Sequence, residues 1–323
     1  MSTTLIFLVL FFSSTMHIQF VVNMDRIMTW VYGSPQYSLE EPIVEELIEN
    51  ESPTLVTFSR NHGFFSWSPL IATVSDKGSE LALLSELLEK VHVEITSPDQ
   101  RMFTTAELLS KVVAYRDLKV GERIPLPMVT RDLKPVLVSY RVDTVFNLWK
   151  GIPAFGLIAE DPDFEPILLF RGTDFFSGTE RSFYSILSNL DQRGVAFSLF
   201  QKGASAIHAW LKTMSENGVP ATVIGYSQGG ALAIYTAIFE RDYVGEVIAF
   251  NPPGVSQEIQ TEWRNLSLPL TLFISQGDFV SKKGSLIGKI YVLFVEPLRA
   301  PIAMHVTLVS GEPTYRRAKA TIP

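Results

Sequence analysis

The stretch ATVIGYSQGGALA, residues 221–233, decides the fold that we expect of this chain. ATVIGYS is a short apolar run of the kind that forms a buried strand, and the small-residue run GGALAIYTAIFE has helical character. Ser227 therefore stands at a predicted strand-to-helix turn, in a Gly-x-Ser-x-Gly pattern typical of a nucleophile. A phosphate loop or a plain turn is the alternative, but the Gly-Lys-Ser/Thr ending of a Walker loop is absent.

Two glycines flank the serine at the positions where this turn brings strand and helix closest together. Side chains at Gly225 and Gly229 would clash, so we expect both to be structural residues of the turn. The first N–H groups of the following helix would face charge that develops at Ser227.

Other apolar runs follow one another on both sides of this turn. Runs without polar alternation indicate strands buried on both faces, as in a parallel sheet. The runs therefore predict an α/β fold with a mostly parallel central sheet flanked by helices. Together with the Gly-x-Ser-x-Gly turn, this layout is α/β-hydrolase-like. The expected strands are PVLVSYRV (135–142), AFGLIAE (154–160), PILLFRG (166–172), ATVIGYS (221–227), EVIAFNPP (246–253) and LTLFISQG (270–277).

His305 is the histidine that chain order selects as general base. In α/β-hydrolases the histidine follows both the serine and the acid, and His305 alone comes late enough. His208 lies in the middle of the helical run SAIHAWL and is interpreted as a packed helix residue. Without a nucleophile upstream, His305 itself would read as an ordinary loop histidine.

The acid is expected after a sheet strand, between the serine and the histidine. Asp278 directly follows the predicted strand LTLFIS, and Asp242 is the other aspartate in this interval. Because Asp242 lies in a solvated helix exit, FERDYVGE, Asp278 is the preferred partner of His305.

Two backbone N–H groups are candidates for holding the oxyanion. Thr173 ends the predicted strand LLFRGT, and Gln228 directly follows the nucleophile at the start of a helix. Taken alone, the RGTD stretch reads equally as a tight turn.

Over about residues 136–312, the chain resembles the fungal-type (class 3) lipase family of α/β-hydrolases. The resemblance rests on FRGT, GYSQGGALA, GDFV and a lone late histidine, which occur in this order. The resemblance implies a Ser227–Asp278–His305 triad and an oxyanion hole formed by Thr173 and Gln228. The family usually reads GHSLGG where this chain has GYSQGG, and an FGSP-like strand end appears here as AFNPPGV. GYSQG is also reminiscent of cutinases, which rely on disulfides that this chain lacks.

Composition excludes several classes of function. The chain has no cysteine among its 323 residues, which excludes thiol chemistry, disulfides and cysteine-ligated metals. Its net charge of −7 argues against a nucleic-acid partner, because phosphate binding needs clustered Lys and Arg. Hydrolysis by a serine triad requires neither a metal nor a cofactor.

The chain is expected to have three parts. Residues 1–22 contain the apolar run LIFLVLFF and form a hydrophobic leader, either a signal peptide or an anchor, which predicts a secreted or membrane-associated protein. A start at Met24 would instead leave a cytoplasmic protein. Residues 25–135 would pack on a hydrolase domain at 136–315. The boundary between the two is expected at RIPLPMVTRDLKP, residues 123–135, where the prolines are expected to break regular structure. The run TTAELLSKVVAYR predicts a helix with a threonine cap.

The expected activity is hydrolysis of carboxylic esters, with lipid esters as the main substrate class and a lipid interface as a partner. A thioesterase or acyltransferase would use the same triad, and a non-catalytic scaffold that binds a lipid or a protein is the alternative of another class. Residues 175–190 carry apolar side chains at helical spacing, which suits either a mobile lid over the site or a helix packed on the core.

Overall fold

The computed structural model describes residues 102–130, 134–173, 185, 188–189, 191, 193–263, 269–295, 301–309 and 315–319. All of them belong to the larger of two compact units, residues 44–323. The hydrophobic leader at 1–22, all of residues 25–101 and most of the lid candidate at 175–190 lie outside the described residues. The domain limits at 1–22, 25–135 and 136–315 therefore stay predictions.

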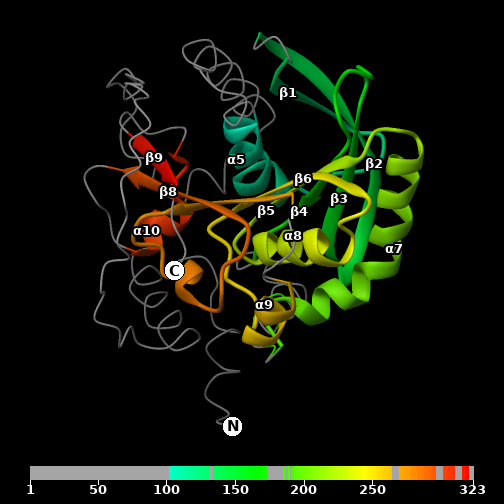
Figure 1. The fold of residues 1–323 in the computed structure, drawn as a ribbon. Helices are drawn as coiled ribbons and strands as arrows, with labels where there is room; N and C mark the ends of the chain where they lie inside the picture. Colours follow the sequence, from blue (N-terminus) through cyan, green and yellow to red (C-terminus); the bar gives the residue numbers. More distant parts are fainter. Residues whose placement is uncertain are drawn as a thin grey trace, which may run out of the picture. The chain divides into compact units, whose positions relative to one another are not determined.

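One nine-stranded sheet organises the described residues, and its strand order follows the chain from β1 to β9 (Figure 1). Strands β1 to β4 are antiparallel, β4 to β8 are parallel, and β9 is antiparallel to β8. The carboxyl ends of the parallel strands consequently share one edge of the sheet. The strands are β1 (Arg123–Val129), β2 (Pro135–Trp149), β3 (Ile152–Ala159), β4 (Ile167–Phe170), β5 (Ala221–Tyr226), β6 (Val244–Phe250), β7 (Leu270–Ser275), β8 (Lys289–Val295) and β9 (Tyr315–Lys319).

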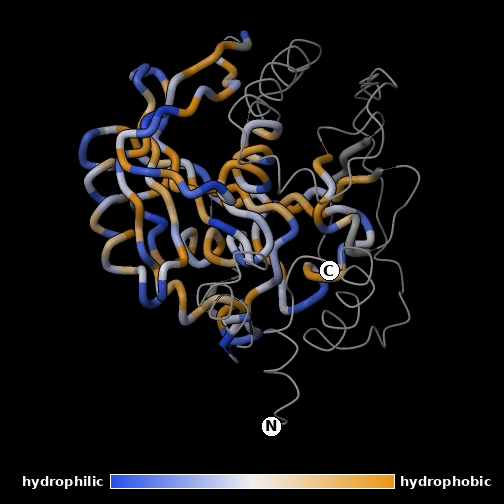
Figure 2. Tube along the Cα trace, turned by 180° about the vertical axis from the view of Figure 1, so that it is seen from behind, coloured by the Kyte–Doolittle hydropathy of each residue, from blue (hydrophilic) through white to orange (hydrophobic). Residues whose placement is uncertain are grey.

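Helices cover both faces of this sheet, so apolar side chains that alternate along one strand enter two different cores. In β4, Leu168 and Phe170 pack with α7 and α8, whereas Ile167 and Leu169 pack on the side of α5. Hydrophobic residues accordingly follow the central strands (Figure 2). The helical elements are α5 (Phe103–Lys111), η2 (Val113–Tyr115), α7 (Phe197–Glu216), α8 (Gln228–Phe239), α9 (Gln257–Trp263), η3 (Val280–Lys282) and α10 (Pro301–Val306).

The predicted fold class is confirmed. Each of the six apolar runs expected to form strands contributes to one, from β2 to β7, and the central strands are parallel and flanked by helices. Among the described residues, no helix is both long and apolar enough to cross a membrane.

The prediction that the proline-spaced run at 123–135 breaks regular structure is wrong. Residues 123–129 form β1, which pairs with β2 at the edge of the sheet. Pro125 and Pro127 are two residues apart, so the places of their missing N–H groups fall on the same side of the strand. An edge strand tolerates this arrangement because that side has no ladder to join.

The threonine cap is also wrong. Helix α5 begins at Phe103, and Met102 occupies the N-cap position without a side-chain hydrogen bond. Thr105 Oγ1 instead donates to the carbonyl of Pro127 in β1. Glu107, which follows the threonines, is buried and bonds to the backbone N–H of Val309, far along the chain. Thr105 and Glu107 therefore form hydrogen bonds with distant segments instead of capping the helix.

Candidate active site

Ser227 lies on a strained turn between β5 and α8. Its φ of 54° and ψ of −122° place a residue with a side chain in a region that is sparsely populated outside glycine. The turn is held from the neighbouring strand, because the N–H of Ser227 donates to the carbonyl of Phe250 at 2.9 Å. Such strain projects the side chain from the edge where the parallel strands end.

The two glycines of the pattern are required by close backbone contacts. A Cβ atom on Gly225 would lie 2.1 Å from the carbonyl oxygen of Gly229. A Cβ atom on Gly229 would lie 2.7 Å from the carbonyl oxygen of Arg171, in the segment that follows β4. Strand, helix start and the 171–173 segment thus meet around Ser227 at distances that leave no room for a methyl group.

The structure brings Ser227, His305 and Asp278 together in a hydrogen-bonded chain. His305 Nε2 lies 2.9 Å from Ser227 Oγ, and His305 Nδ1 lies 2.7 Å from Asp278 Oδ1. All three side chains are buried, although 78 residues separate serine and histidine. Asp278 follows β7 and His305 lies in α10, so chain order, loop position and contact agree for these three residues.

The charge state of Asp278 defines the direction of these hydrogen bonds. Burial alone would raise the pKa of its carboxyl, but the charge and hydrogen bond of His305 and two bonds from Ser281 outweigh burial and lower it. The N–H and hydroxyl of Ser281 donate to Oδ2 at 2.9 and 2.6 Å. An ionised carboxylate only accepts, so Nδ1 of His305 carries a proton, and in the neutral imidazole Nε2 accepts from the hydroxyl of Ser227.

Thr173 and Gln228 lie on two sides of the same turn. Phe170 is the register partner of Gly225, so the segment after β4 runs beside the segment that carries Ser227. Gln228 is the first residue of α8, and the first N–H groups of a helix have no partner within it. Thr173 is buried in the segment that follows β4, and Gln228 adjoins Ser227 directly. The residues of both candidate N–H donors therefore belong to the segments that meet at this turn.

The side chain of Gln228 has a contact set that the sequence reasoning missed. Its Nε2 donates to Ser185 O at 2.7 Å, Asn189 Oδ1 at 2.7 Å and Ser188 Oγ at 2.9 Å, while its Oε1 accepts from Ser185 Oγ at 2.9 Å. Asn189 Nδ2 in turn donates to Thr173 Oγ1 at 3.1 Å. Gln228 thus links α8 to Ser185, Ser188 and Asn189 and, through Asn189, to Thr173.

The histidine segment is anchored by a buried ion pair from α5. Lys111 Nζ lies 2.7 Å from Glu107 Oε1, and both side chains are almost completely buried. Lys111 also donates to the carbonyl of Thr307 at 2.6 Å, and Glu107 accepts from the N–H of Val309 at 2.8 Å. Helix α5, which lies before residue 136, therefore holds the chain just after His305.

The rejected alternatives lie elsewhere. His208 Nδ1 is 2.8 Å from Glu240 Oε2, and its ring packs edge-on against Tyr243. Asp242 lies 3.6 Å from Arg241 in the turn before β6. The turn before β6 lies at the amino ends of the parallel strands, whereas Ser227 lies at their carboxyl ends. Among the described residues, no cluster of histidine and acidic side chains could hold a metal ion.

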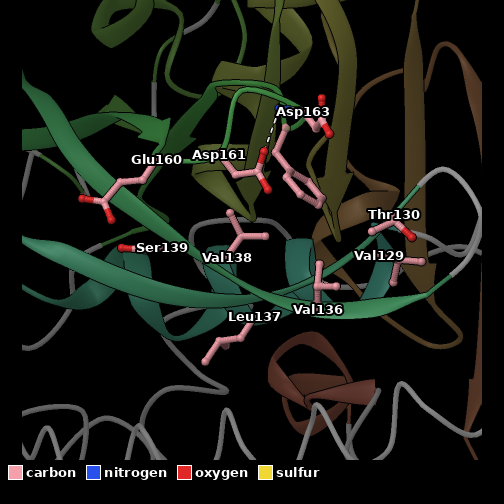
Figure 3. A pocket seen from close by; sticks show the side chains of 10 residues that line it. Val129, Thr130, Val136, Leu137, Val138, Ser139, Glu160, Asp161 and Asp163 are labelled. Carbon is pink, nitrogen blue, oxygen red and sulfur yellow. Dashed lines mark hydrogen bonds between the residues drawn. The ribbon is translucent and has the colours of Figure 1, made fainter.

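A cavity of about 570 Å³ also lies near the amino ends of the parallel strands, away from Ser227. Figure 3 shows the side chains that line it. Its acidic side chains come from the loop after β3, where the N–H of Asp163 donates to Asp161 Oδ1. This loop precedes β4, whereas Ser227 follows the carboxyl end of β5. The cavity contains no member of the hydrogen-bonded triad. Its lining residues are Val129, Thr130, Val136, Leu137, Val138, Ser139, Glu160, Asp161, Asp163 and Phe164.

The chain is similar to a curated protein and to several solved structures. No model of a protein family matches the chain. Acyl-protein thioesterase 1 homolog 2 of Dictyostelium discoideum is 31% identical over 99 residues, which is 28% of this chain and 45% of that protein. The chain therefore spans less than half the length of this relative.

Two of the similar solved structures are lipases. Lip2 lipase from Yarrowia lipolytica is 13% identical, with a TM-score of 0.38, over 62% of this chain and 80% of that chain. A triacylglycerol lipase from Penicillium expansum is 11% identical, with a TM-score of 0.34, over 60% of this chain and 78% of that chain.

Proposed function

We propose that the chain is a serine hydrolase that cleaves carboxylic esters, with acylglycerols and other lipid esters as its substrate class. The observation that carries the proposal is the unbroken hydrogen-bonded chain from Ser227 through His305 to Asp278, with the serine on a strained turn. A buried serine that served only packing would need neither the strain nor the histidine.

In the proposed reaction, Ser227 Oγ attacks the carbonyl carbon of the ester while His305 Nε2 takes the hydroxyl proton. Asp278 holds the Nδ1–H of the ring and stabilises the imidazolium. The backbone N–H groups of Thr173 and Gln228 bind the oxyanion. Collapse of the tetrahedral intermediate releases the alcohol, which receives the proton from His305, and leaves an acyl group on Ser227. Water, activated by the same histidine, then releases the acid and restores the serine.

A panel of nitrophenyl esters of increasing acyl length tests this proposal with wild type and Ser227→Ala side by side. We expect hydrolysis by the wild type and a loss of several orders of magnitude in the variant, because the nucleophile is removed. A fluorophosphonate probe should label residue 227 of the folded protein. Equal hydrolysis by both proteins, or a probe adduct elsewhere, would contradict the triad. A folded wild type without labelling or turnover would favour a non-catalytic scaffold.

A thioesterase is the second candidate, favoured by the similarity to an acyl-protein thioesterase homolog over 99 residues. The triad attacks thioesters by the same steps, so the two candidates differ in the leaving group. Oxygen esters and thioesters with the same acyl chain should be compared by kcat/KM. A thioester preference well beyond the intrinsic difference in hydrolysis rates would favour the thioesterase. Transfer of the acyl group to an added alcohol or amine in preference to water would identify an acyltransferase.

We also propose that residues 1–22 direct the chain to or across a membrane when translation starts at Met1. The support is the apolar run LIFLVLFF and the absence of Lys, Arg, Asp and Glu from the first 22 residues. This placement suits an enzyme that meets lipid esters at an interface.

A further inference from the structure

Asn251 occupies an unusual position directly after β6. Its φ of 43° lies in the left-handed region, which favours glycine and which asparagine tolerates better than most residues. The residue is 1% exposed. A glycine would satisfy this backbone without strain, so the presence of a buried amide needs a reason of its own.

Two neighbours determine which way the amide of Asn251 points. The N–H of Ser275 can only donate, so the atom 2.7 Å from it must be Oδ1. The other atom, Nδ2, lies 2.7 Å from the carbonyl oxygen of His305, which can only accept. Its second hydrogen is directed to Ser275 Oγ at 3.2 Å. Each end of the amide therefore has a partner of the matching kind.

These bonds connect the three segments that carry the triad. Phe250, which precedes Asn251, accepts the N–H of Ser227 at 2.9 Å. Ser275 ends β7 and accepts the N–H of Asp278 at 2.9 Å. The third partner is the backbone of His305 itself. The side chain of Asn251 thus connects the end of β6 with the end of β7 and with His305. The relative positions of these segments determine the distances between Ser227, His305 and Asp278.

We propose that Asn251 is a positioning residue for His305. Its amide fixes the backbone of the histidine relative to the end of β7, and so holds the imidazole between Ser227 and Asp278. The inference rests on the proposed function, because it concerns the efficiency of the same triad. The ion pair from α5 bonds the backbone at Thr307 and Val309, whereas the amide of Asn251 bonds the carbonyl of His305 itself.

The substitution Asn251→Gly separates the side chain from the backbone conformation. Glycine adopts the left-handed φ freely, so the chain path is preserved while the bonds to Ser275 and His305 are lost. We expect kcat to fall by about ten- to a hundredfold, as for a displacement of up to 1 Å in a reacting group, with little change in KM. The rate constant for phosphonylation of Ser227 by a fluorophosphonate should fall by a similar factor, while the final extent of labelling stays complete.

Asn251→Asp is the isosteric second variant. The carboxylate keeps the acceptor for the N–H of Ser275 but turns an oxygen toward the carbonyl of His305, so we expect a loss at least as large as in Asn251→Gly. This variant tests the proposal if the glycine variant does not fold. Lys150→Gly is the matched control, because Lys150 also has a left-handed φ, of 50°, at the exposed turn between β2 and β3. It should retain wild-type rates.

The readouts distinguish positioning from a general structural role. A structural role alone would lower the melting temperature and the fraction of protein that labels, but folded molecules would react with the probe at the wild-type rate. Folded Asn251→Gly or Asn251→Asp with wild-type kcat and phosphonylation rate would overturn the inference. Ser227→Ala, measured in parallel, keeps the two failures apart: persistent hydrolysis there would sink the proposed function, whatever Asn251 does.

Discussion

Gly225→Ala should damage both the fold and the activity, because the turn that carries Ser227 has no room for a methyl group. The new Cβ would lie 2.1 Å from the carbonyl oxygen of Gly229 and 2.4 Å from its carbonyl carbon, whereas ordinary contact begins near 3.4 Å. Relief therefore requires a backbone shift of about 1 Å between β5 and α8. Both elements are buried, so neither moves alone.

The cost follows from this displacement. Overpacking a core costs about 1–3 kcal/mol, and a clash between two backbones belongs at the upper end. About 3 kcal/mol corresponds to a fall in Tm of roughly 6–12 °C for a domain of this size class. A shift of about 1 Å at Ser227 should lower kcat/KM by about a hundredfold per folded molecule.

Circular dichroism melting and nitrophenyl ester hydrolysis measure the two effects on the same sample. Gly245→Ala is the matched control, because it lies in a neighbouring strand, is exposed, and would place its Cβ 3.2 Å from the carbonyl oxygen of Pro220. It should change Tm by a few degrees at most and leave kcat/KM unaltered. If Gly225→Ala has the Tm and the kcat/KM of the wild type, the strand and the helix do not approach closely enough to exclude a methyl group at residue 225.

Three further predictions concern the site, and a fourth concerns the N-terminal leader. Asp278→Asn should lower kcat by on the order of 10⁴, measured by ester hydrolysis, because an amide that donates to Nδ1 of His305 leaves Nε2 protonated and unable to accept. Since the pKa of Asp278 is lowered in the folded protein, its ionised form stabilises the fold above the unfolded pKa of about 3.9, and this contribution is lost as pH falls through the folded value. Melting temperatures should therefore fall more steeply below about pH 4 in wild type than in Asp278→Asn. Thr173→Val removes a hydroxyl that accepts from Asn189 and keeps the backbone N–H. A large drop in kcat at constant KM would show that the hydroxyl stabilises the transition state, whereas wild-type kcat would show that only the backbone N–H does so. A reporter fused after Val22 should be found at a membrane or exported, and a purely cytosolic signal from a Met1 start would contradict the leader.

Local signals in the sequence were enough for the central strands and for the turn at Ser227. Each buried strand is a short apolar run, and the glycines at 225 and 229 reflect a contact between segments only four residues apart. The same local reasoning failed for β1, because the tolerance for Pro125 and Pro127 depends on the position of the strand at the sheet edge. Strands β8 and β9 were not identified in advance, although KIYVLFV is an apolar run of strand length.

Contacts that join distant segments escaped the sequence reasoning. Chain order selected His305 and Asp278, and both lie where that order requires. The amides of Gln228 and Asn251 gave no such signal, because each acts through partners that are distant in sequence and shares no motif with them. Gln228 could be noticed only as a departure from the usual motif, and Asn251 only as an asparagine where a glycine is usual.

The bond between Glu107 and Val309 has a consequence for the order in which the molecule matures during synthesis. The sheet is built from consecutive strands, so β1 to β7 can assemble from neighbours as the chain emerges. The carboxylate of Glu107 and its partner Lys111 on α5, however, meet backbone partners that lie 202 and 196 residues later, respectively. Until the ribosome has released that stretch, a nucleophile would exist on its turn with no base beside it. Under the proposed function, the nascent protein would thus stay inactive until its last elements dock, and the appearance of activity would mark the final step of folding.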